Sequence, residues 1–274
     1  MKTIAVFDSG VGGLSVLRAL YRHIPEVHWI YAADSAFAPY GERTESEVRA
    51  RSLQVAQWLQ RQHEPDVLVV ACNTATAWAI DSLREKLPVL PIVGVEPALK
   101  PAALLSRTAH VGVLATSGTL SSPRFAGLLG TVQAQASAVR FSCQPCPGLA
   151  DAIERAHDSA IRDLCNTYAQ ALLARGIAER PLDTVVLGCT HYPFAMRHWQ
   201  EAFGPHVAIL DNAPAIARRT ADLLGGVALP DQTDTLNAPE ASLYASGDVP
   251  MLRQACNRWV PDLNVRSASR LNLP

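Results

Sequence analysis

The amino-acid sequence predicts an α/β fold with two lobes, in which mainly parallel sheets are flanked by helices. Short apolar runs, often β-branched, alternate along the chain with segments whose apolar residues recur at helical spacing. The apolar runs are continuous, as in strands that helices cover on both faces. Two proline-containing segments, 96–101 and 211–214, each follow a strand and are candidate crossings between two lobes.

Local signals indicate where the elements begin. A first helix is expected after the glycine-containing turn at 10–13, because apolar residues from Leu14 to Ile24 recur at helical spacing. A second helix is expected after Thr44, which forms with Glu47 the capping-box pattern of a helix N-terminus. Further helices are expected at 75–83 and 194–202, and strands at 4–7, 29–32, 67–71, 92–95, 111–114, 184–187 and 207–210.

The two candidate crossings also suggest where the lobes divide. If the chain crosses at both, the first lobe comprises residues 1–96 plus 211–274, and the second comprises residues 97–210. Residues 225–241 are rich in Pro, Asp and Thr and are expected to form a surface loop.

Composition and charge exclude several classes of protein. The chain has 274 residues, 49% of them hydrophobic and 18% charged, so it can bury a large core and is not disordered. A net charge of −1, with Arg218-Arg219 as the longest basic run, argues against a nucleic-acid-binding surface. The first apolar run ends at Asp8, and no stretch approaches the roughly 18 apolar residues of a membrane-spanning helix. We therefore expect a cytoplasmic chain with reduced thiols and no membrane association.

Two of the six cysteines occur in the same local pattern. Cys72 and Cys189 each follow the end of an apolar strand and a small residue, and each precedes two polar residues and a helical stretch. Both are therefore expected at the carboxyl edge of a strand, where α/β folds bind ligands. Unpaired backbone N–H groups at such a helix N-terminus are expected to lower the pKa of a cysteine from its free value of about 8.5.

The alternative interpretation is that both cysteines are small buried side chains, since free cysteine is often buried. The repetition of the whole pattern favours a functional role. The other cysteines serve as a contrast: Cys165 and Cys256 are in line with apolar residues of their helices and are expected in the core. Cys143 and Cys146 have CxxC spacing, but the nearby prolines and the absence of a second ligand pair argue against a redox or zinc site.

Two thiols in opposed lobes suggest a specific chemistry. If the lobes face each other, the sulfurs of Cys72 and Cys189 flank a ligand held in the cleft between them. One thiolate can then remove a proton from one face of a carbon while the other thiol returns a proton to the opposite face, which inverts the configuration. This reaction requires neither a metal nor a redox cofactor, and we expect none.

Two further side chains are expected beside these thiols. Asp8 ends the first strand at the same sheet edge as Cys72, where it can act as a helix N-cap or accept a proton from the cysteine. His191 stands two residues after Cys189 and can assist that thiol in the same way. Tyr40-Gly41 and Thr116–Thr119 also follow strands and offer weaker candidates for binding a carboxylate.

These residues together resemble the glutamate racemases of the aspartate/glutamate racemase family. The resemblance extends in order from Phe7 to Pro193. Its matching blocks are Phe7 to Leu14, Pro39-Tyr40-Gly41, Ala71 to Ala75, Thr116 to Thr119, Cys146-Pro147 with Glu154, and Gly188 to Pro193. The resemblance implies a cofactor-independent two-base racemase with two pseudo-twofold-related lobes and the active site in the cleft between them.

The resemblance also implies roles for individual residues. Cys72 would deprotonate the D-substrate and Cys189 the L-substrate, with Asp8, His191 and Glu154 as further acid–base residues. The substrate-binding residues would be Ser9, Tyr40, Gly41, Asn73, Thr74, Thr116, Thr119 and Thr190. The implied substrate is glutamate, the implied role is the supply of D-glutamate for bacterial peptidoglycan, and the implied assembly is a homodimer. Because the first expected strand starts at Ile4, we expect no activation by a cell-wall precursor.

Two other functions stay open at this point. A sibling racemase acting on aspartate would need the same two thiols and a different pocket. A non-catalytic binding or inhibitor protein on the same scaffold would not need the thiols at all. Loss of optical activity with one amino acid, and its dependence on Cys72, separate these alternatives.

Overall fold

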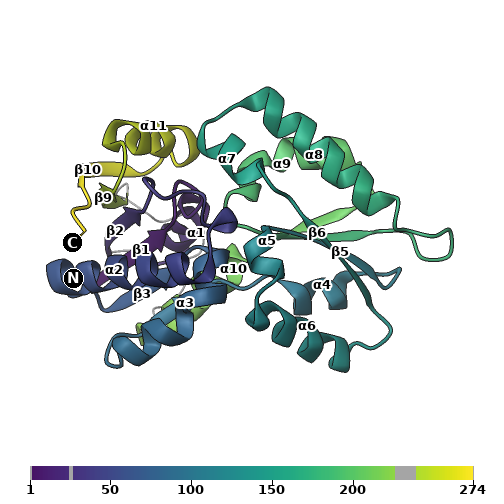
Figure 1. Cartoon of the computed structure of the whole chain (residues 1–274), viewed down its shortest axis with the longest axis horizontal. Helices are drawn as coiled ribbons and strands as arrows, with labels where there is room; N and C mark the ends of the chain where they lie inside the picture. The colour runs from purple at the N-terminus through teal and green to yellow at the C-terminus, as the bar shows by residue number, and fades with distance from the viewer. Residues whose placement is uncertain (1, 25–26, 226–238, 274) are drawn as a thin grey trace.

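The computed structural model describes residues 2–24, 27–225 and 239–273. They form two lobes, each a parallel sheet between two layers of helices (Figure 1). The first lobe, which holds both ends of the chain, contains a six-stranded sheet of order β10-β9-β2-β1-β3-β4, and the second contains a four-stranded sheet of order β6-β5-β7-β8. The predicted fold class is confirmed.

The elements of the first lobe come from both halves of the chain. Its strands are β1 (Lys2–Asp8), β2 (Val27–Ala33), β3 (Val67–Val70), β4 (Ile92–Gly94), β9 (Glu240–Ala245) and β10 (Asn264–Arg270). Its helices are α1 (Leu14–His23), η1 (Tyr40–Glu42), α2 (Glu45–His63), α3 (Asn73–Lys86), α10 (Ala213–Leu223) and α11 (Val249–Trp259).

The second lobe is continuous in the sequence. Its strands are β5 (His110–Ala115), β6 (Arg140–Pro145), β7 (Thr184–Gly188) and β8 (Ala208–Leu210). Its helices are α4 (Leu99–Leu105), α5 (Ser117–Leu120), α6 (Pro123–Gln135), α7 (Leu149–Glu154), α8 (Asp158–Leu173), η2 (Tyr192–Ala195) and α9 (Met196–Phe203). Each strand falls within the range proposed for its lobe, 1–96 plus 211–274 or 97–210, and the boundaries themselves stay a proposal.

Helices cover both faces of each sheet, which explains the continuous apolar strands. In β1, Ile4 and Val6 pack with α1, α10 and α11, whereas Ala5 and Phe7 pack with α2 and α3. The second sheet is covered by α4 and α6 on one face and by α7, α8 and α9 on the other. A strand buried on both faces has no position where a polar side chain reaches water.

The two sheets repeat one strand order. The order β2-β1-β3-β4 of the first lobe matches β6-β5-β7-β8 of the second, so that β3 corresponds to β7. Cys72 and Cys189 follow these two corresponding strands. Strands β9 and β10 extend the first sheet alone.

Local predictions are met in most places and wrong in some. The predicted helix N-terminus at Thr44 is confirmed, because Thr44 caps α2 in a complete capping box with Glu47.

Other local predictions are wrong. Strands β6, β9 and β10 were not predicted, because β6 and β10 are edge strands with polar residues, and in β9 (EASLYA) polar residues interrupt the continuous apolar run on which the prediction relied. Most of the loop predicted at 225–241 lies outside the described residues, but Glu240 and Ala241 belong to β9. The helix predicted at 194–202 begins as the short η2 before α9.

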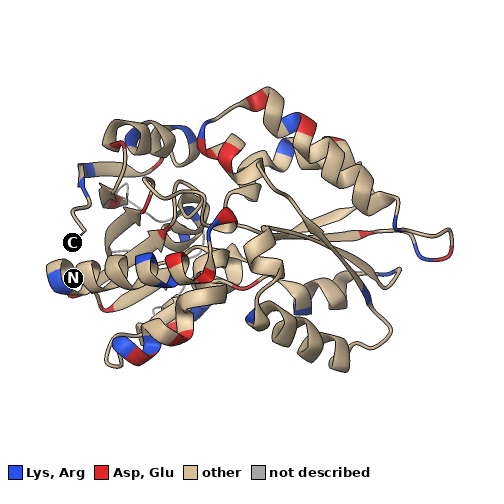
Figure 2. Ribbon diagram, viewed as in Figure 1, with Lys and Arg blue, Asp and Glu red and all other residues tan. Residues whose placement is uncertain are grey.

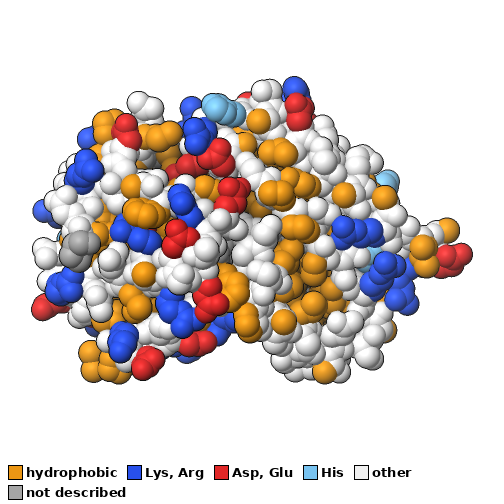
Figure 3. All heavy atoms as spheres, in the orientation of Figure 1, with side chains coloured by type: hydrophobic (Ala, Val, Ile, Leu, Met, Phe, Trp, Pro, Cys, Tyr) orange, Lys and Arg blue, Asp and Glu red, His pale blue; other side chains and the backbone are white. Residues whose placement is uncertain are grey.

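Charged side chains of both signs are interspersed on the face shown in Figures 2 and 3, most densely over the first lobe and the junction between the lobes. In the part of the chain that the structure describes, none of the helices combines the length and the apolar character needed to span a bilayer.

Candidate active site

The structure places both cysteines at the carboxyl ends of corresponding strands. Cys72 is the N-cap of α3, and its sulfur accepts a hydrogen bond from the backbone N–H of Ala75 at 3.4 Å. Cys189 lies in the turn between β7 and η2, where its carbonyl accepts from the N–H of Tyr192 at 3.1 Å. Both side chains are buried, with 5% and 7% of the residue exposed.

A serine and a carboxylate stand beside Cys72. The thiol lies 3.6 Å from Oγ of Ser9, which lies 3.4 Å from Oδ1 of Asp8. The same Oδ1 accepts from the N–H of Gly10 at 2.7 Å, and Oδ2 accepts from Oγ1 of Thr190 at 3.0 Å. Asp8 is thus connected to the thiol through Ser9 and to the opposite lobe through Thr190. Its expected role as a helix N-cap is wrong, because α1 begins at Leu14 and its N-cap is Gly13.

A histidine and a carboxylate stand beside Cys189. Its sulfur lies 3.8 Å from Nδ1 of His191, whose Nε2 lies 2.8 Å from Oε2 of Glu154. The same Oε2 accepts from the backbone N–H of Val11 in the first lobe at 2.9 Å. A continuous series of contacts therefore runs from Cys72 through Ser9, Asp8 and Thr190 to the neighbourhood of Cys189, His191 and Glu154.

The glycine turn after β1 allows the lobes to meet this closely. A Cβ at Gly10 would overlap the carboxylate of Glu154, and a Cβ at Gly12 would overlap the ring of His191. Next to this turn, Oγ of Ser15 donates to the carbonyl of Thr190 at 2.8 Å. Only glycine fits at such approaches of backbone to side chain.

The charge states differ between the two cysteine sites. Burial, reinforced by the nearby charge of Asp8, raises the pKa of Cys72 to about 12, so the expectation of a lowered pKa is wrong for this thiol. Burial also raises the pKa of Asp8 to about 6. Burial alone would lower the pKa of His191, but its hydrogen bonds to Cys189 and Glu154 raise it well above its ordinary value. A protonated His191 provides a positive partner for a thiolate on Cys189.

Three of the predicted substrate-binding threonines form one cluster between the lobes. Oγ1 of Thr74, from the first lobe, lies 2.9 Å from Oγ1 of Thr116 and 3.3 Å from Oγ1 of Thr119, both from the second lobe. Gly41 packs against Thr116, since a Cβ at Gly41 would lie only 2.6 Å from Cβ of Thr116. The hydroxyl of Tyr40 instead donates to Asp34 at 2.6 Å, so it is the backbone of this turn that remains for a ligand.

Two hollows lie next to this cluster. One, at the mouth of the interlobe cleft, is lined by Gly41, Glu42, Thr116, Cys146 and Gly148 among others, and the N–H of Gly148 donates to Glu42 across it at 3.2 Å.

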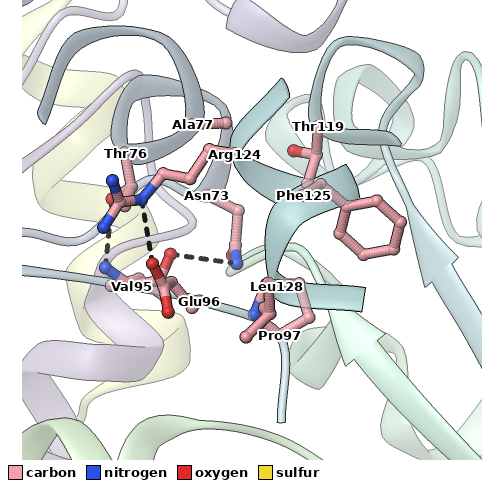
Figure 4. A pocket seen from close by; sticks show the side chains of 10 residues that line it. All are labelled: Asn73, Thr76, Ala77, Val95, Glu96, Pro97, Thr119, Arg124, Phe125 and Leu128. Atoms are coloured by element: carbon pink, nitrogen blue, oxygen red, sulfur yellow. Dashed lines mark hydrogen bonds and ion pairs between the residues drawn. The ribbon is translucent and has the colours of Figure 1, made fainter. Parts of the chain in front are cut away.

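The second hollow lies behind the cluster, between α3, α6 and the crossing segment (Figure 4). There, Nδ2 of Asn73 lies 3.5 Å from the carbonyl of Val95, and Oδ1 of Asn73 is buried without a partner. Arg124 donates to Glu96 at 2.8 Å and to Asp81 at 3.2 Å, which ties α6 to the first lobe. Neither Cys72 nor Cys189 lines either hollow.

The remaining cysteines fit their predicted structural places. All six cysteines are free, and Cys165 and Cys256 are buried in α8 and α11, as expected. Within residues 2–24, 27–225 and 239–273, no group of three or more metal-ligating side chains occurs.

Sequence reasoning missed one buried acid of this region. Asp34 directly follows β2, as Asp8 ends the neighbouring β1, and it is fully buried. The signal was available, because the carboxyl end of a strand next to β1 reaches the same sheet edge. It went unused because Asp34 stands outside the glycine, cysteine and threonine motifs.

Comparisons with known proteins identify the family of this chain. A family model described as Asp/Glu/Hydantoin racemase matches residues 12–220. The chain is 45% identical over 248 residues to the glutamate racemase of Ectopseudomonas mendocina, an alignment that covers 90% of each chain. It is 45% identical over 229 residues to the glutamate racemase of Pseudomonas aeruginosa, covering 82% of this chain and 83% of that one.

Solved structures extend the likeness to the whole fold. The glutamate racemase of Escherichia coli, solved with L-glutamate and the activator UDP-MurNAc-Ala, superposes with a TM-score of 0.83 at 33% identity, covering 100% of this chain and 99% of that one. An allantoin racemase of Pseudomonas fluorescens shares the fold alone, with a TM-score of 0.53 at 16% identity over 86% of this chain and all of that one.

Proposed function

Because this chain belongs to the Asp/Glu/Hydantoin racemase family, we propose that it interconverts L- and D-glutamate through the thiols of Cys72 and Cys189. The single observation that carries the two-base assignment is the placement of both thiols at corresponding strand ends of two facing lobes, joined by Asp8 and Thr190. The reaction is an isomerisation, in which the Cα–H bond breaks on one face and a new one forms on the other.

In the direction from L- to D-glutamate, Cys189 is the base. The ring of His191, 3.8 Å from the sulfur and oriented by Glu154, is placed to carry the proton that the thiol releases. The resulting thiolate takes the proton of Cα, and the electron pair left on Cα receives a proton from the thiol of Cys72. The raised pKa of Cys72 keeps that thiol protonated, as an acid must be before the step.

In the direction from D- to L-glutamate, Cys72 must first lose its proton. The route that the contacts provide leads from Cys72 to Oγ of Ser9 and from Ser9 to Oδ1 of Asp8. Since the pKa of Asp8 is about 6, this carboxyl is mostly ionised above that pH and can accept the proton. After the thiolate of Cys72 takes the proton of Cα, the thiol of Cys189 supplies the new one on the opposite face, from the proton that this sulfur exchanges with His191.

Access of substrate to the thiols requires the lobes to separate. Both thiols are buried, and neither of them lines the hollow at the cleft mouth. Two of the cross-lobe contacts, Glu42–Gly148 and Arg124–Asp81, lie at the surface with Glu42 and Asp81 exposed, so these two can break at modest expense in free energy. Reclosure would expel water around the Cα–H, which suits a reaction through a weak base.

The substrate can be identified in solution. Purified protein is incubated without pyridoxal phosphate with L-glutamate, D-glutamate, L-aspartate or D-aspartate, and ellipticity is followed over time. We expect ellipticity to decay to zero with either glutamate enantiomer and much more slowly with aspartate. Faster decay with aspartate would identify an aspartate racemase, and no decay with any of the four would favour a non-catalytic binding role.

The same family membership supports a proposal for the biological role, the location and the assembly of the chain. We propose that the reaction supplies D-glutamate for peptidoglycan, that the chain acts in the cytoplasm and that it assembles as a homodimer. Sedimentation of the purified chain tests the assembly, since a single species at the monomer mass would contradict it.

A further inference from the structure

We propose that Asp34 is a positioning residue that holds the Tyr40–Gly41 turn in place for the substrate, an inference that rests on the proposed function. Asp34 lies directly after β2 and is fully buried. Nothing in the two-thiol chemistry requires it, so its burial needs another reason. A buried carboxylate without partners is strongly destabilising, and Asp34 is surrounded by donors instead.

Four side-chain hydrogen bonds converge on this carboxylate. Oδ1 accepts from Nη2 of Arg51 at 2.7 Å and from Oγ of Ser246 at 2.6 Å. Oδ2 accepts from Nε of Arg51 at 2.9 Å and from the hydroxyl of Tyr40 at 2.6 Å. Each oxygen is therefore shared between the fork of Arg51 and one hydroxyl, a geometry that fixes the plane of the carboxylate.

The donors come from separate parts of the first lobe. Arg51 belongs to α2, and its guanidinium also stacks on the ring of Phe37, 3.9 Å from the centroid. Ser246 follows β9, nearly two hundred positions further along the chain, and its own N–H donates to the carbonyl of Ala33 at 3.0 Å. Asp34 thus rests on a framework built from β2, α2 and the segment after β9.

Two connections lead from Asp34 to the proposed active site. Its backbone N–H donates to the carbonyl of Asp8 at 3.0 Å. Its carboxylate holds the ring of Tyr40, which precedes Gly41, and Gly41 packs against Thr116 of the threonine cluster. Through Tyr40, the framework therefore sets where the backbone of the turn meets Thr116.

The hydroxyl of Tyr40 is engaged with Asp34 and not free for a ligand. Tyr40 is 1% exposed, and burial next to Asp34 raises its pKa well above the ordinary value, so it stays a neutral donor. We infer that this hydrogen bond acts on substrate affinity indirectly, by ordering the turn. Its loss should weaken ground-state and transition-state binding alike, which raises KM and leaves kcat nearly unchanged.

The test compares Tyr40→Phe with Tyr21→Phe in the glutamate assay. Tyr21 is a matched control because it is also a buried tyrosine of the first lobe, and its hydroxyl has no hydrogen-bond partner. We expect Tyr40→Phe to raise KM about tenfold for both enantiomers, with kcat changed less than about threefold, and Tyr21→Phe to match the wild type. The melting temperature of each variant is measured alongside.

A double variant shows whether Tyr40 acts through Asp34. Asp34→Ala leaves Tyr40 no acceptor, so it should raise KM at least as much as Tyr40→Phe, and the combination should lie within about twofold of Asp34→Ala, because the shared interaction is already lost. If Asp34→Ala does not fold, Asp34→Leu replaces it, since leucine fills the space of the carboxylate without an acceptor.

The results separate three outcomes. A wild type that fails to racemise glutamate overturns the proposed function on which this inference rests. An active wild type with an unchanged KM in Tyr40→Phe overturns the positioning role, even if the melting temperature falls. Multiplicative KM effects in the double variant would mean that Tyr40 acts on the substrate independently of Asp34, which also overturns it.

Discussion

The surroundings of Cys72 and Cys189 share a backbone plan and differ in their acid–base partners. Both cysteines follow the corresponding strands β3 and β7 and precede a polar residue and a helical turn. Cys72 faces a serine and a buried carboxyl whose pKa burial raises to about 6. Cys189 faces His191, whose pKa its hydrogen bonds to Cys189 and Glu154 raise despite burial.

The fold and the neighbouring side chains therefore contribute differently to the reaction. The repeated strand order places two sulfurs alike, as an approximately symmetric reaction requires. The neighbours then give the two sulfurs different proton partners, a carboxyl reached through Ser9 at Cys72 and an imidazole at Cys189. Each sulfur acts as the base in one direction and as the acid in the other, so each needs a partner that can take its proton and return it.

The largest expected effect comes from removing either sulfur. Cys72→Ser and Cys189→Ser should each lower racemisation by about a thousandfold or more, because each removes one of two obligatory proton carriers. In D2O, Cys72→Ser should still exchange the Cα–H of L-glutamate, and Cys189→Ser that of D-glutamate, as followed by proton NMR.

The control for these variants is Cys256→Ala, which alters a buried cysteine of α11 that packs only in the core of the first lobe. It should retain nearly full turnover. If both serine variants exchanged the same enantiomer, or if either kept near-full activity, the opposed roles of the two cysteines would be wrong.

A smaller effect is expected from the assisting groups. Asp8→Asn should reduce kcat mainly from D- to L-glutamate, and His191→Asn mainly in the opposite direction, each by about a hundredfold. Because the two enantiomers are equal in free energy, kcat/KM must stay equal in both directions, so the asymmetry appears in kcat and KM separately. Progress curves from each pure enantiomer measure kcat and KM in each direction. Equal kcat losses in both directions would contradict the assignment of Asp8 to Cys72 and of His191 to Cys189.

The pH dependence separates the two sites further. With a pKa of about 6, Asp8 is ionised above that pH and becomes protonated as the pH falls through it, so it can no longer accept the proton of Cys72. We expect kcat/KM for either enantiomer to decline below about pH 6, by up to about tenfold per pH unit. Asp8→Asn should lack this decline, and an unchanged acid limb in that variant would assign it to another group.

The smallest effect is expected at the contact that joins the two sites. Thr190→Val removes one of the hydrogen bonds that stabilise the ionised form of Asp8, so the acid limb should shift to higher pH by less than about one unit. Thr220→Val is the control, since it removes a buried hydroxyl that bonds only the carbonyl of Ile216 within α10. An equal shift in both variants would show a general effect of lost stability.

Much of the fold was accessible from the sequence because its central strands are covered on both faces. Runs such as Val67–Val70 and Thr184–Gly188 are buried throughout, and continuous burial leaves a continuous apolar signature. Edge strand β10, with the sequence NVRSASR, buries too little to leave one. The pairing of β10 with β9 is a tertiary contact, which a local sequence pattern does not predict.

The candidate site likewise has a part that the sequence predicted and a part that it did not. The twin cysteines, Asp8 and His191 were found because strand ends and turns mark them, and Glu154 came from the family resemblance alone. The sequence did not predict the raised pKa of Cys72, because the burial of this thiol depends on how segments distant in the sequence pack around it. The framework around Asp34 was missed because Arg51 and Ser246 reach it from distant segments.

The most direct test of the central claim is a structure of the wild-type chain with glutamate bound. The two-base mechanism predicts that Cα lies between the sulfurs of Cys72 and Cys189, each within about 3.5 Å and on opposite faces of the stereocentre. A glutamate whose Cα meets only one sulfur, or both on one face, would contradict it.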